Sequence, residues 1–400
     1  MNVQCRTENC VKVYDTAKAY EGYTLFAQHA STDVWLIDMQ GRIVHRWKME
    51  TPLGGDERLL PNGNLLRINK TFNEPSGALG SVGELLLEVA WDGSIVWSHR
   101  NPTMHHDFCR LKNGNTLINI HVRIPIEIVK KVKGGMPESR KNAEIWGSGL
   151  QEINPDGEVV WEWIGHEHLD PEIDIFCPLC PLSIWGYING VDVFPNGDIV
   201  ASFRHLNALM IIDRQSGEIK WRWGSDKLGH QHHPTVLENG NILLFDNGFH
   251  RRLEKKYMDT FSMESNSRVL EVDPRTDEVV WQYEAEDKFS FYSPICSSAE
   301  RLINGNTLIC ESTKGRIFEV TKEKEIVWEF ISPFYIEKNR LGRTNYIFRA
   351  HRYGHNFPGF EGKDLSIGRF DFVIKNNKSQ FNPKENQSKK ENHRLVSLGY

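Results

Sequence analysis

An Asn-Gly turn between two apolar runs occurs five times in this chain, and no other feature limits the possible folds as strongly. Asn-Gly between apolar runs favours a β-hairpin with a two-residue type I′ turn, because both central residues of that turn need positive φ. Each copy therefore predicts two short antiparallel strands. The copies are LLPNGNLLRIN (59–69), RLKNGNTLINI (110–120), VFPNGDIVASF (193–203), VLENGNILLFD (236–246) and RLINGNTLICE (301–311).

A second unit alternates with these hairpins and ends in tryptophan. It consists of a turn cluster followed by an apolar pair, as in EVAWDGSIVW and EVTKEKEIVW. Its six copies end at Trp47, Trp97, Trp163, Trp223, Trp281 and Trp328. One hairpin of each kind gives four antiparallel strands in about 50 to 60 residues, which is the size of a propeller blade. The sequence therefore predicts an all-β fold, a six-bladed β-propeller of four-stranded antiparallel blades, with the tryptophans packed between blades.

The repeats divide the chain into four parts. Residues 1–20 are an N-terminal segment, 21–335 the propeller, and 336–374 a C-terminal segment that packs on the propeller or closes it. Residues 375–400 are polar and poor in apolar residues, which is typical of a disordered tail. The first tryptophan unit follows no Asn-Gly turn, so the inner strand of its blade is expected from elsewhere in the chain. Residues 367–374 are the candidate closing strand, and a short helix is expected within 336–353.

Charge and hydropathy give no indication of a nucleic-acid or membrane partner. The 400 residues carry a net charge of -5, with 39% apolar and 25% charged residues. No run of apolar residues is long enough to span a membrane as a helix, and the N-terminus lacks the basic and apolar regions of a signal peptide. We therefore expect a cytoplasmic protein, or an exported one if the N-terminus is incomplete. The sequence indicates no oligomeric state.

Seven scattered cysteines do not form the framework expected of a secreted disulfide-rich protein. Cys177 and Cys180 form the one CxxC motif. A zinc ribbon needs a second such pair, so a reduced structural loop is favoured over a local disulfide or redox role. No HxxxH pair is predicted on a helix, and the nearest carboxylates are Asp107 and Asp192. No metal and no cofactor are predicted.

Polar residues converge at the hairpin ends that lie away from the turns. With a two-residue turn, the residue seven before the Asn lies opposite the residue eight after it. All of these positions are expected around one mouth of the central channel, where they form a polar pocket on rigid strands. The predicted pairs are Gly55 with Lys70, His106 with His121, Asn189 with Arg204, His232 with Asn247, and Ser297 with Ser312.

Histidine fills the same position in two of these hairpins, at His106 and His232. Each begins a dense cluster, MHHDF and HQHHP, and His205 ends a strand at the same mouth. His106, His205 and His232 are therefore candidate catalytic residues, with His121 as a further one. His233, His250 and Arg251 lie a few residues beyond the paired positions.

Three of these motifs resemble those of the bacterial arylsulfotransferases, which work without a nucleotide sulfate donor on a six-bladed propeller. The motifs are HHDFCRLKNGNTL, ASFRHLNALMIIDRQSGEIKWRWG and HQHHPTVLENGN, and the resemblance extends from about residue 20 to 360, including FRAHRY at 348–353. It implies that His232 of Gln231-His232-His233 is the nucleophile that becomes sulfated, with His106 and His205 in support. The exported members carry a signal peptide and an N-terminal sandwich domain, which residues 1–20 do not match.

The resemblance implies an aryl-sulfate sulfotransferase with small-molecule partners, an aryl sulfate and a phenol. The sulfuryl group would move in two half-reactions through a sulfohistidine, without a cofactor. Arg204, Asn189 and Arg251 are candidate ligands of the sulfate oxygens. The family's active-site arginine matches no motif in this chain, and Arg204, Arg251 and Arg349 are its candidates.

Two other classes of function remain open at this point. One is a non-catalytic propeller that binds a partner or a small anion at the same mouth, since propellers serve many unrelated roles. The other is an enzyme that depends on a quinone or a metal. The natural phenols are not indicated, because the pocket would be shaped by irregular insertions at 119–146 and 165–187, which are expected to act as a lid.

Overall fold

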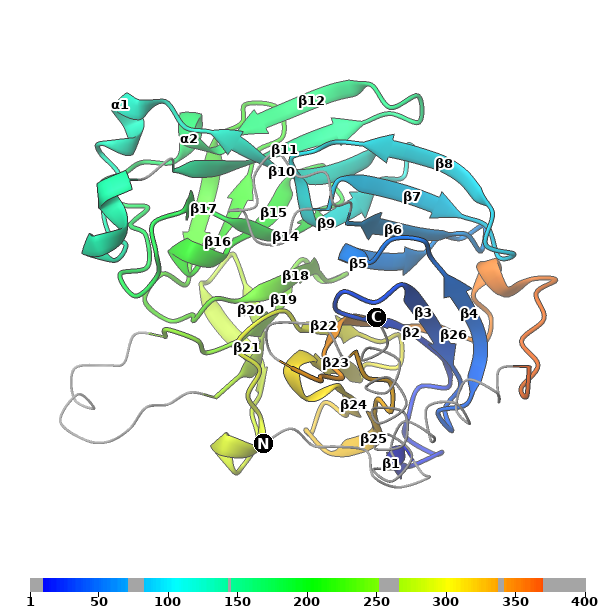
Figure 1. Cartoon of the computed structure of the whole chain (residues 1–400). Coiled ribbons are helices and arrows are strands. Elements are labelled where there is room, and N and C mark those ends of the chain that lie inside the picture. The colour runs from blue at the N-terminus through cyan, green and yellow to red at the C-terminus, as the bar shows by residue number, and fades with distance from the viewer. Residues whose placement is uncertain (1–9, 71–82, 143–144, 252–265, 337–341, 370–400) are drawn as a thin grey trace, which may run out of the picture.

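The strands pair in antiparallel runs of four that follow the chain, in an all-β, propeller-like arrangement (Figure 1). The computed structural model describes residues 10–70, 83–142, 145–251, 266–336 and 342–369. Three of the runs are separate sheets, and a fourth carries β1 as an additional outer strand. The all-β propeller architecture predicted from the repeats is therefore confirmed.

In each separate sheet, hydrogen-bonded strands follow one another from the innermost strand outward. The first sheet is β26 (Ile347–Gly354), β2 (Gly22–Gln28), β3 (Asp33–Ile37) and β4 (Ile43–Lys48). The next two are β14 (Ile188–Val193), β15 (Ile199–Phe203), β16 (Ala208–Ile212) and β17 (Ile219–Trp223), and β18 (His232–Val236), β19 (Ile242–Asp246), β20 (Arg268–Asp273) and β21 (Glu278–Tyr283). The last is β22 (Ser298–Arg301), β23 (Thr307–Glu311), β24 (Arg316–Val320), β25 (Ile326–Ile331) and β1 (Val11–Tyr14).

The remaining strands form one nine-stranded sheet. Its two runs are β5 (Leu53–Leu59), β6 (Leu65–Asn69), β7 (Leu85–Val89) and β8 (Ile95–Arg100), and β9 (Met104–Arg110), β10 (Thr116–Arg123), β11 (Trp146–Ile153) and β12 (Val159–Ile164), with β13 (Ile184–Trp185) beside β11. Parallel pairing of Gly55 in β5 with His106 in β9 joins the runs. A Cβ on Gly55 would lie 2.6 Å from the His106 carbonyl oxygen, so only glycine permits this approach. The prediction of six separate blades is thus not confirmed by the hydrogen bonding.

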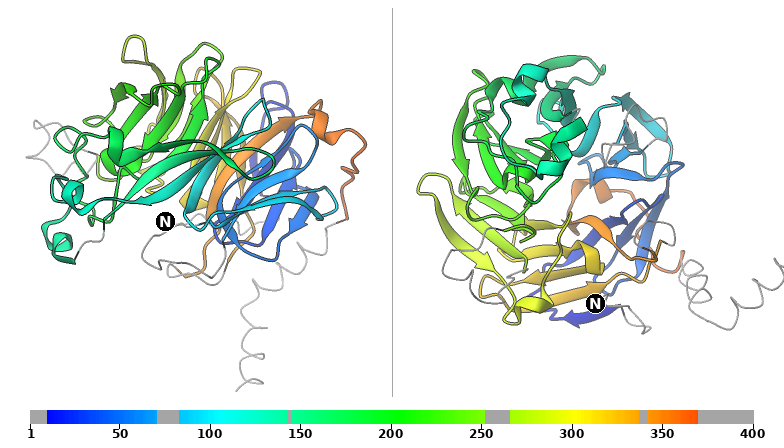
Figure 2. Two further views of the ribbon diagram at one scale, coloured as in Figure 1. Left: turned by 90° about the horizontal axis from the view of Figure 1, so that it is seen from above. Right: turned by 60° about the vertical axis from the view of Figure 1, so that its left-hand side comes forward.

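The innermost strands of the runs contact one another in a closed ring, in the order β26, β5, β9, β14, β18, β22 and back to β26. Figure 2 shows the sheets arranged in succession around this centre. The inner strand of the first sheet is β26, which pairs with β2. The described part of 336–353 contains no helix, and residues 347–353 belong to β26 instead. Residues 367–369 form no strand, and the rest of the predicted closing strand and the tail at 375–400 lie outside the described residues.

The Asn-Gly segments form hairpins, but with loops of three residues rather than the predicted two. Leu60 and Asn64 close the first loop through the hydrogen bond from Leu60 N–H to the Asn64 carbonyl, and the other four loops follow the same pattern. The glycines alone have positive φ, from 83° to 93°. Each preceding asparagine accepts the N–H two residues on with its side chain, at 3.0 to 3.1 Å. A type I turn followed by a left-handed glycine explains both features.

The second asparagine of each NGN segment links its loop to the third strand of the run. Asn64, Asn241 and Asn306 donate to Glu88, Glu271 and Glu319 at 2.7 to 2.8 Å, and Asn115 donates to Glu152 in the same way. These glutamates begin the Glu-Val or Glu-Ile of the tryptophan units. The two sequence repeats are therefore parts of one hydrogen-bonded unit.

Replacing Asn306 with alanine should lower the free energy of unfolding by about 1 to 3 kcal/mol, because it removes a hydrogen bond from the fully buried carboxylate of Glu319. Urea unfolding followed by tryptophan fluorescence measures this change. Ile303→Ala, at an 85% exposed position of the same loop, is the matched control and should be nearly neutral. An equal loss in both variants would contradict the assigned role of Asn306.

Tryptophans on the outer strands connect each run to the next. Each indole N–H donates to a carbonyl in the turn before the outer strand of the following run. Trp328, in the last run, donates to the Met39 carbonyl in the first sheet at 2.8 Å. The predicted packing role is confirmed by these contacts. The other pairs are Trp47 with Ala90, Trp97 with Pro155, Trp163 with Gly217, Trp223 with Asp277, and Trp281 with Lys322.

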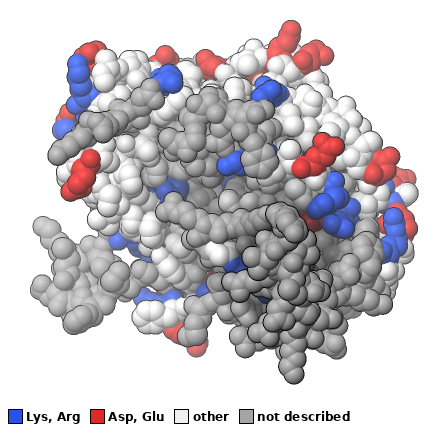
Figure 3. Space-filling model, viewed as in Figure 1, with Lys and Arg blue, Asp and Glu red and all other residues white. Residues whose placement is uncertain are grey.

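The second strands of the runs are buried on both faces because sheets pack on either side of them. β6, β15, β19 and β23 are buried at every residue, which explains why most of their residues are apolar. Val200 and Leu209, for example, share a core cluster with Ile242 and Leu270 of the following sheet. The outer strand β8 is instead largely exposed. On the face seen in Figure 3, acidic and basic side chains of the described residues are interspersed.

Two insertions leave the regular pattern and pack against each other. The first follows Arg123 and contains α1 (Ile126–Val129) and the 3₁₀ helix η1 (Pro137–Asn142); the second contains α2 (Gly165–His168) and ends at β13. Gly134 bridges to Phe176, and Met136 N–H donates to the Cys180 carbonyl at 2.9 Å. Residues 119–123, which were expected in the first insertion, belong to β10. No helix among the described residues is long and apolar enough to cross a membrane.

Candidate functional site

Three buried histidines lie at or directly after inner strands of neighbouring sheets. His106 is in β9, His232 begins β18, and His205 follows β15 in the 3₁₀ helix η2 (Arg204–Leu206). Their exposed fractions are 4%, 3% and 6%. The charge of a protonated His232 is among the influences that lower the pKa of His106, after burial, so these two rings lie within electrostatic reach of each other. The structure therefore gathers the histidines that the sequence singled out.

His232 is held in one tautomer by Asn247. The Asn247 amide nitrogen donates to the carbonyls of Ser293 and Cys296, at 2.8 and 2.9 Å, so its oxygen must face His232. His232 Nδ1, 2.7 Å from that oxygen, is thus the protonated nitrogen. Nε2 then carries the lone pair. Burial, followed by the charge of Arg204, lowers the pKa of His232 to about 3, so the ring is neutral at pH 7.

His205 is fixed in the same way by a backbone carbonyl. Its Nδ1 lies 2.9 Å from the Ile184 carbonyl oxygen and must donate to it, which leaves Nε2 as an acceptor. Burial, with the charge of Arg204 in addition, lowers the pKa of His205 to about 3. A neutral imidazole with a free nitrogen can accept a proton from a bound hydroxyl group.

Tyr187 lies between His205 and His106 and was not singled out in the sequence. Its ring stacks on His205 with centroids 4.8 Å apart, and its hydroxyl is 3.4 Å from His106 Nε2. His106 Nδ1 in turn is 2.9 Å from His105 Nδ1. Burial, more than neighbouring charges, holds the pKa of His106 well below its usual range. Tyr187 therefore positions two of the candidate histidines, and no repeat or motif marks it in the sequence.

His121 stacks on His105, with ring centroids 3.8 Å apart. It is buried, and neither ring nitrogen has a hydrogen-bond partner among the described residues. Burial lowers its pKa to about 3. His121 thus presents unpaired polar atoms beside the histidine cluster, but it is not paired with His106 in the strand register.

Arg204 is the one candidate arginine without a carboxylate partner. Its side chain makes no hydrogen bond or ion pair with the described part of the chain, whereas its charge, after burial, lowers the pKa values of His205 and His232. Arg349 donates to Asp107 at 2.6 Å and also contacts Asp56 at 3.1 Å. Arg251 contacts Asp246 at 2.9 Å. Only Arg204 therefore offers an uncompensated positive charge beside neutral histidines.

Asn189 supports the segment that carries His232. Its amide nitrogen donates to the Gln231 carbonyl at 2.8 Å, and its buried oxygen has no partner among the described residues. The Arg349 guanidinium donates to the Asn189 carbonyl at 3.1 Å. Asn189 is thus placed to position the residue before His232, with one oxygen left to bind another group.

A cluster of buried charged residues lies next to the candidate site, and sequence reasoning missed it. Burial alone would raise the pKa of Asp56, but Arg349, Arg58 and His351 outweigh it and hold that pKa well below its usual range. Burial would lower the pKa of His351, yet Asp56 raises it to about 9, so His351 is charged at pH 7. The FRAHRY segment supplies both Arg349 and His351. Only the fold shows which carboxylates pair with these two cations.

The register predicted for the polar pairs is wrong. The three-residue loops shift each hairpin by one residue, and bulges in β9 and β18 shift it further, so His105 pairs with Asn119 and His232 with Phe245. His106 and His233 lie in these bulges with φ of 58° and 52°. Non-glycine residues rarely adopt this conformation, and it occurs most often where function re-aims a side chain. Because of the bulge, His232 and Asn247 are not opposite each other in the strand register. They contact each other only through their side chains.

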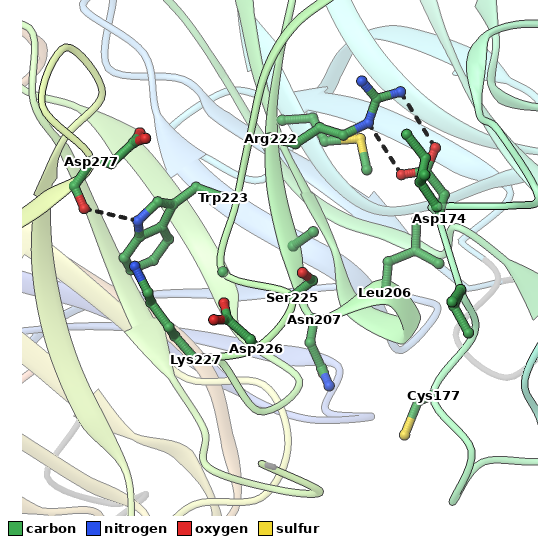
Figure 4. Close-up of a pocket in the computed structure, with 15 residues that line it drawn as sticks. Asp174, Cys177, Leu206, Asn207, Arg222, Trp223, Ser225, Asp226, Lys227 and Asp277 are labelled. Atoms are coloured by element: carbon green, nitrogen blue, oxygen red, sulfur yellow. Dashed lines mark hydrogen bonds and ion pairs between the residues drawn. The ribbon is translucent and has the colours of Figure 1, made fainter. Parts of the chain in front are cut away.

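A cavity of about 500 Å³ lies beside this cluster rather than within it (Figure 4). It is lined by Leu206 and Asn207, which follow His205, and by Cys177 and Trp223. Arg222, which also lines it, is bound to Asp174 at 3.1 Å. None of the predicted catalytic or substrate-binding residues lines this cavity. Its other cation, Lys227, lies over the Trp223 ring, 5.2 Å from the ring centroid.

The buried neutral histidines should make the fold unstable in mild acid. The folded-state pKa of His121, His205 and His232 is about 3, below the unfolded value of 6.5, so only the unfolded chain takes up their protons between these limits. The stability that these neutral histidines contribute to the folded state is lost as the pH falls below 6.5. Together these residues should lower the free energy of unfolding by about 4 kcal/mol between pH 7 and 5.5.

Urea unfolding at these two pH values tests this expectation. His121→Gln should remove about 1 kcal/mol of the pH-dependent difference, since it deletes one of the groups that the unfolded state protonates. His355→Gln, at a position whose side chain is 56% exposed, is the comparison variant. A free energy of unfolding that does not change between pH 7 and 5.5 would show that these histidines are not buried as neutral rings.

Comparison with known proteins places these residues in a family. The family model described as arylsulfotransferase (ASST) matches residues 78–333, more than half of the chain, and this range includes all three histidines. The arylsulfate sulfotransferase AssT of Escherichia coli O6:H1 is 33% identical over 94 residues, which is 22% of this chain and 15% of that protein. The chain thus matches a small part of this curated relative.

Solved structures support the architecture. A protein of unknown function from Bacteroides caccae matches with a TM-score of 0.52 and 13% identity, over 82% of this chain and 98% of that one. Virginiamycin B lyase from Staphylococcus aureus matches with a TM-score of 0.40 and 13% identity, over 70% of this chain and 69% of that one. At this identity, the first likeness shows the fold alone.

Proposed function

Because this chain belongs to the arylsulfotransferase (ASST) family, we propose that it transfers a sulfuryl group from an aryl sulfate to a phenol, with His232 as nucleophile. The observation that carries the proposal is the neutral His232, whose Nδ1 is held by Asn247 and whose Nε2 carries the lone pair, near the unpaired cation Arg204. A nucleophile and a charge for the sulfuryl oxygens are the two elements that such a transfer needs.

In the first half-reaction, His232 Nε2 attacks the sulfur of the aryl sulfate. The N–S bond forms as the bond between sulfur and the aryl oxygen breaks, and the phenolate leaves with the electron pair. The sulfated ring gains positive charge, and the Asn247 oxygen stabilises the Nδ1–H that it already accepts. Arg204 stabilises the charge that spreads over the three sulfuryl oxygens.

In the second half-reaction, an acceptor phenol attacks the same sulfur. Its oxygen forms the new S–O bond, its proton passes to His205 Nε2, and the N–S bond breaks to return neutral His232. His106 supports the same proton transfer from the opposite side of Tyr187. Because one histidine serves both half-reactions, the kinetics should be ping-pong.

A release assay tests the proposal. Purified full-length protein is mixed with a chromogenic aryl sulfate, with and without an excess of a second phenol. We expect release of the chromophore to depend on the acceptor phenol and to yield the acceptor's sulfate ester in equal amount. Release with water alone would point to a sulfatase, and no release across several donors would contradict the transferase assignment.

A second candidate function rests on the same unpaired Arg204. A non-catalytic propeller could use this cation, together with the N–H of the neutral His121 ring, to hold a small anion. Such a protein would bind sulfate or an aryl sulfate without turnover. Isothermal titration with an aryl sulfate, run beside the release assay, separates binding from transfer.

We propose further that the nine-stranded sheet counts as two blades, which gives six. Among the described residues, the parallel pair of Gly55 with His106 is the only strand pairing between β5 and β9, whereas the strands within each run pair over several residues. The tryptophan hydrogen bonds also pass from Trp97 in one run to Pro155 in the other, as they do between separate sheets. Each of the six blades then contains one of the six innermost strands.

A further inference from the structure

Two cysteines and two histidines meet next to the histidine cluster, outside the residues used in the proposed reaction. Cys177 and Cys180 lie in the second insertion, His230 directly precedes β18, and His250 follows β19. One nitrogen or sulfur atom from each lies within 4.8 Å of the others. We propose that Cys177, Cys180, His230 and His250 bind one zinc ion as a structural site.

The distances between these atoms fit a tetrahedral metal. Cys180 Sγ lies 3.5 Å from His230 Nε2 and 3.4 Å from His250 Nδ1, and Cys177 Sγ lies 3.6 Å from His250 Nδ1. With Zn–S of about 2.3 Å and Zn–N of about 2.0 Å, a tetrahedral ion separates its sulfur and nitrogen ligands by about 3.5 Å. All four ligands can therefore reach one ion with little movement.

The chemistry of the donors favours zinc over other common ions. Two sulfurs and two imidazoles form a set with no oxygen ligand, which suits zinc and not magnesium or calcium.

The backbone is also shaped to bring the histidines together. His230 and His250 have φ of 55° and 59°, which non-glycine residues rarely adopt, and Gly248 between the strand and His250 has φ of 75°. A Cβ at Gly248 would lie 2.0 Å from the Asn266 carbonyl oxygen. Such backbone is retained where another interaction holds it, and a bound ion is an interaction of that kind.

The site would fasten the second insertion to the candidate active site. Cys177 N–H donates to the His205 carbonyl at 2.7 Å, and Phe176 packs on His205 with ring centroids 4.7 Å apart. His230 is two residues before His232. With four protein ligands the ion has no open position, so its role is to hold these backbones rather than to bind substrate.

Spacing in the sequence misses this site because its second pair of ligands is not a second CxxC. Cys180 and the two histidines are 50 and 70 residues apart in the chain, and the fold brings them together from separate segments. The sequence therefore predicted a reduced loop and no metal at Cys177 and Cys180. The proposal does not depend on sulfuryl transfer, and its test needs no measurement of activity.

The metal content of purified full-length protein tests the proposal. Protein is prepared with a phosphine reductant, dialysed against metal-free buffer and analysed by mass spectrometry of its elements. We expect one zinc per chain, with none in Cys177→Ser or Cys180→Ser. Cys109→Ala changes a cysteine outside the site and should retain the zinc.

A second measurement covers variants that fail to fold. Wild-type protein stripped with a chelator is titrated with Co²⁺, which gives thiolate charge-transfer absorption and the strong visible bands of a tetrahedral site. One cobalt per chain, displaced by zinc, is the expected result. Reduced, folded wild-type protein that takes up neither ion, or a folded Cys177→Ser protein that binds as well as wild type, would overturn the assignment.

Discussion

Replacing His232 with asparagine is expected to lower kcat/KM for an aryl sulfate by at least about 10³-fold, since removal of a nucleophile leaves only binding and charge stabilisation. Asparagine is similar in size but has no nitrogen lone pair that can form the N–S bond. In the wild-type protein Asn247 fixes the proton on Nδ1, so the lone pair that the variant loses is that of Nε2.

Initial rates of chromophore release, with both donor and acceptor varied, measure this loss. His99→Asn on β8 is the matched control and should keep full activity, because its strand is on the outside of the sheet. Circular dichroism and the melting temperature must show that both variants fold. Activity of folded His232→Asn within tenfold of wild type would remove His232 as the nucleophile.

Arg204→Ala is expected to lower kcat/KM by about 10² to 10³-fold, the effect of losing one group that stabilises charge in the transition state. No described carboxylate pairs with Arg204, so its charge is available to a bound sulfuryl group. Arg204→Lys should recover part of the activity, because lysine keeps the charge but loses the planar pair of donors. The same loss of charge should raise the pKa of His205 and His232.

The Arg251→Gln variant tests whether Arg251, rather than Arg204, binds the sulfate group. Arg251 is already bound to Asp246, so its replacement should reduce stability more than turnover per folded molecule. Steady-state kinetics on both variants, with histidine pKa values from NMR titration, decide between them. A larger loss of kcat/KM in Arg251→Gln than in Arg204→Ala would transfer the sulfate-binding role to Arg251.

The predictable part of this fold depends on contacts that are close in the sequence. The hairpins follow from glycine's preference for positive φ in a loop, and the glutamate and tryptophan repeats follow from hydrogen bonds that recur in each run. β26 was missed because its partner β2 is more than 300 residues away, so no turn marks the pair. The basic sequence of β26, IFRAHRYG, was instead interpreted as part of a region with a short helix.

The candidate site was predicted in its residues but not in its geometry. Histidines that share a hairpin position were recognisable, because the repeat defines that position. The register was wrong because three-residue loops and the bulges at His106 and His233 move the pairing. Tyr187, Cys177 and Cys180 come from an insertion outside the repeat, and His230 and His250 lie beyond the ends of β18 and β19. Only the folded chain therefore shows what these residues contact.

If His232 carries the sulfuryl group between donor and acceptor, the most direct measurement of that step is the mass of the protein itself. Protein exposed to an aryl sulfate without acceptor is quenched, and its intact mass and peptides are determined. We predict the mass of one added sulfuryl group, located on His232 and lost when a phenol is added before the quench. Full turnover by protein that never carries this group, or carries it on another residue, would contradict transfer through His232.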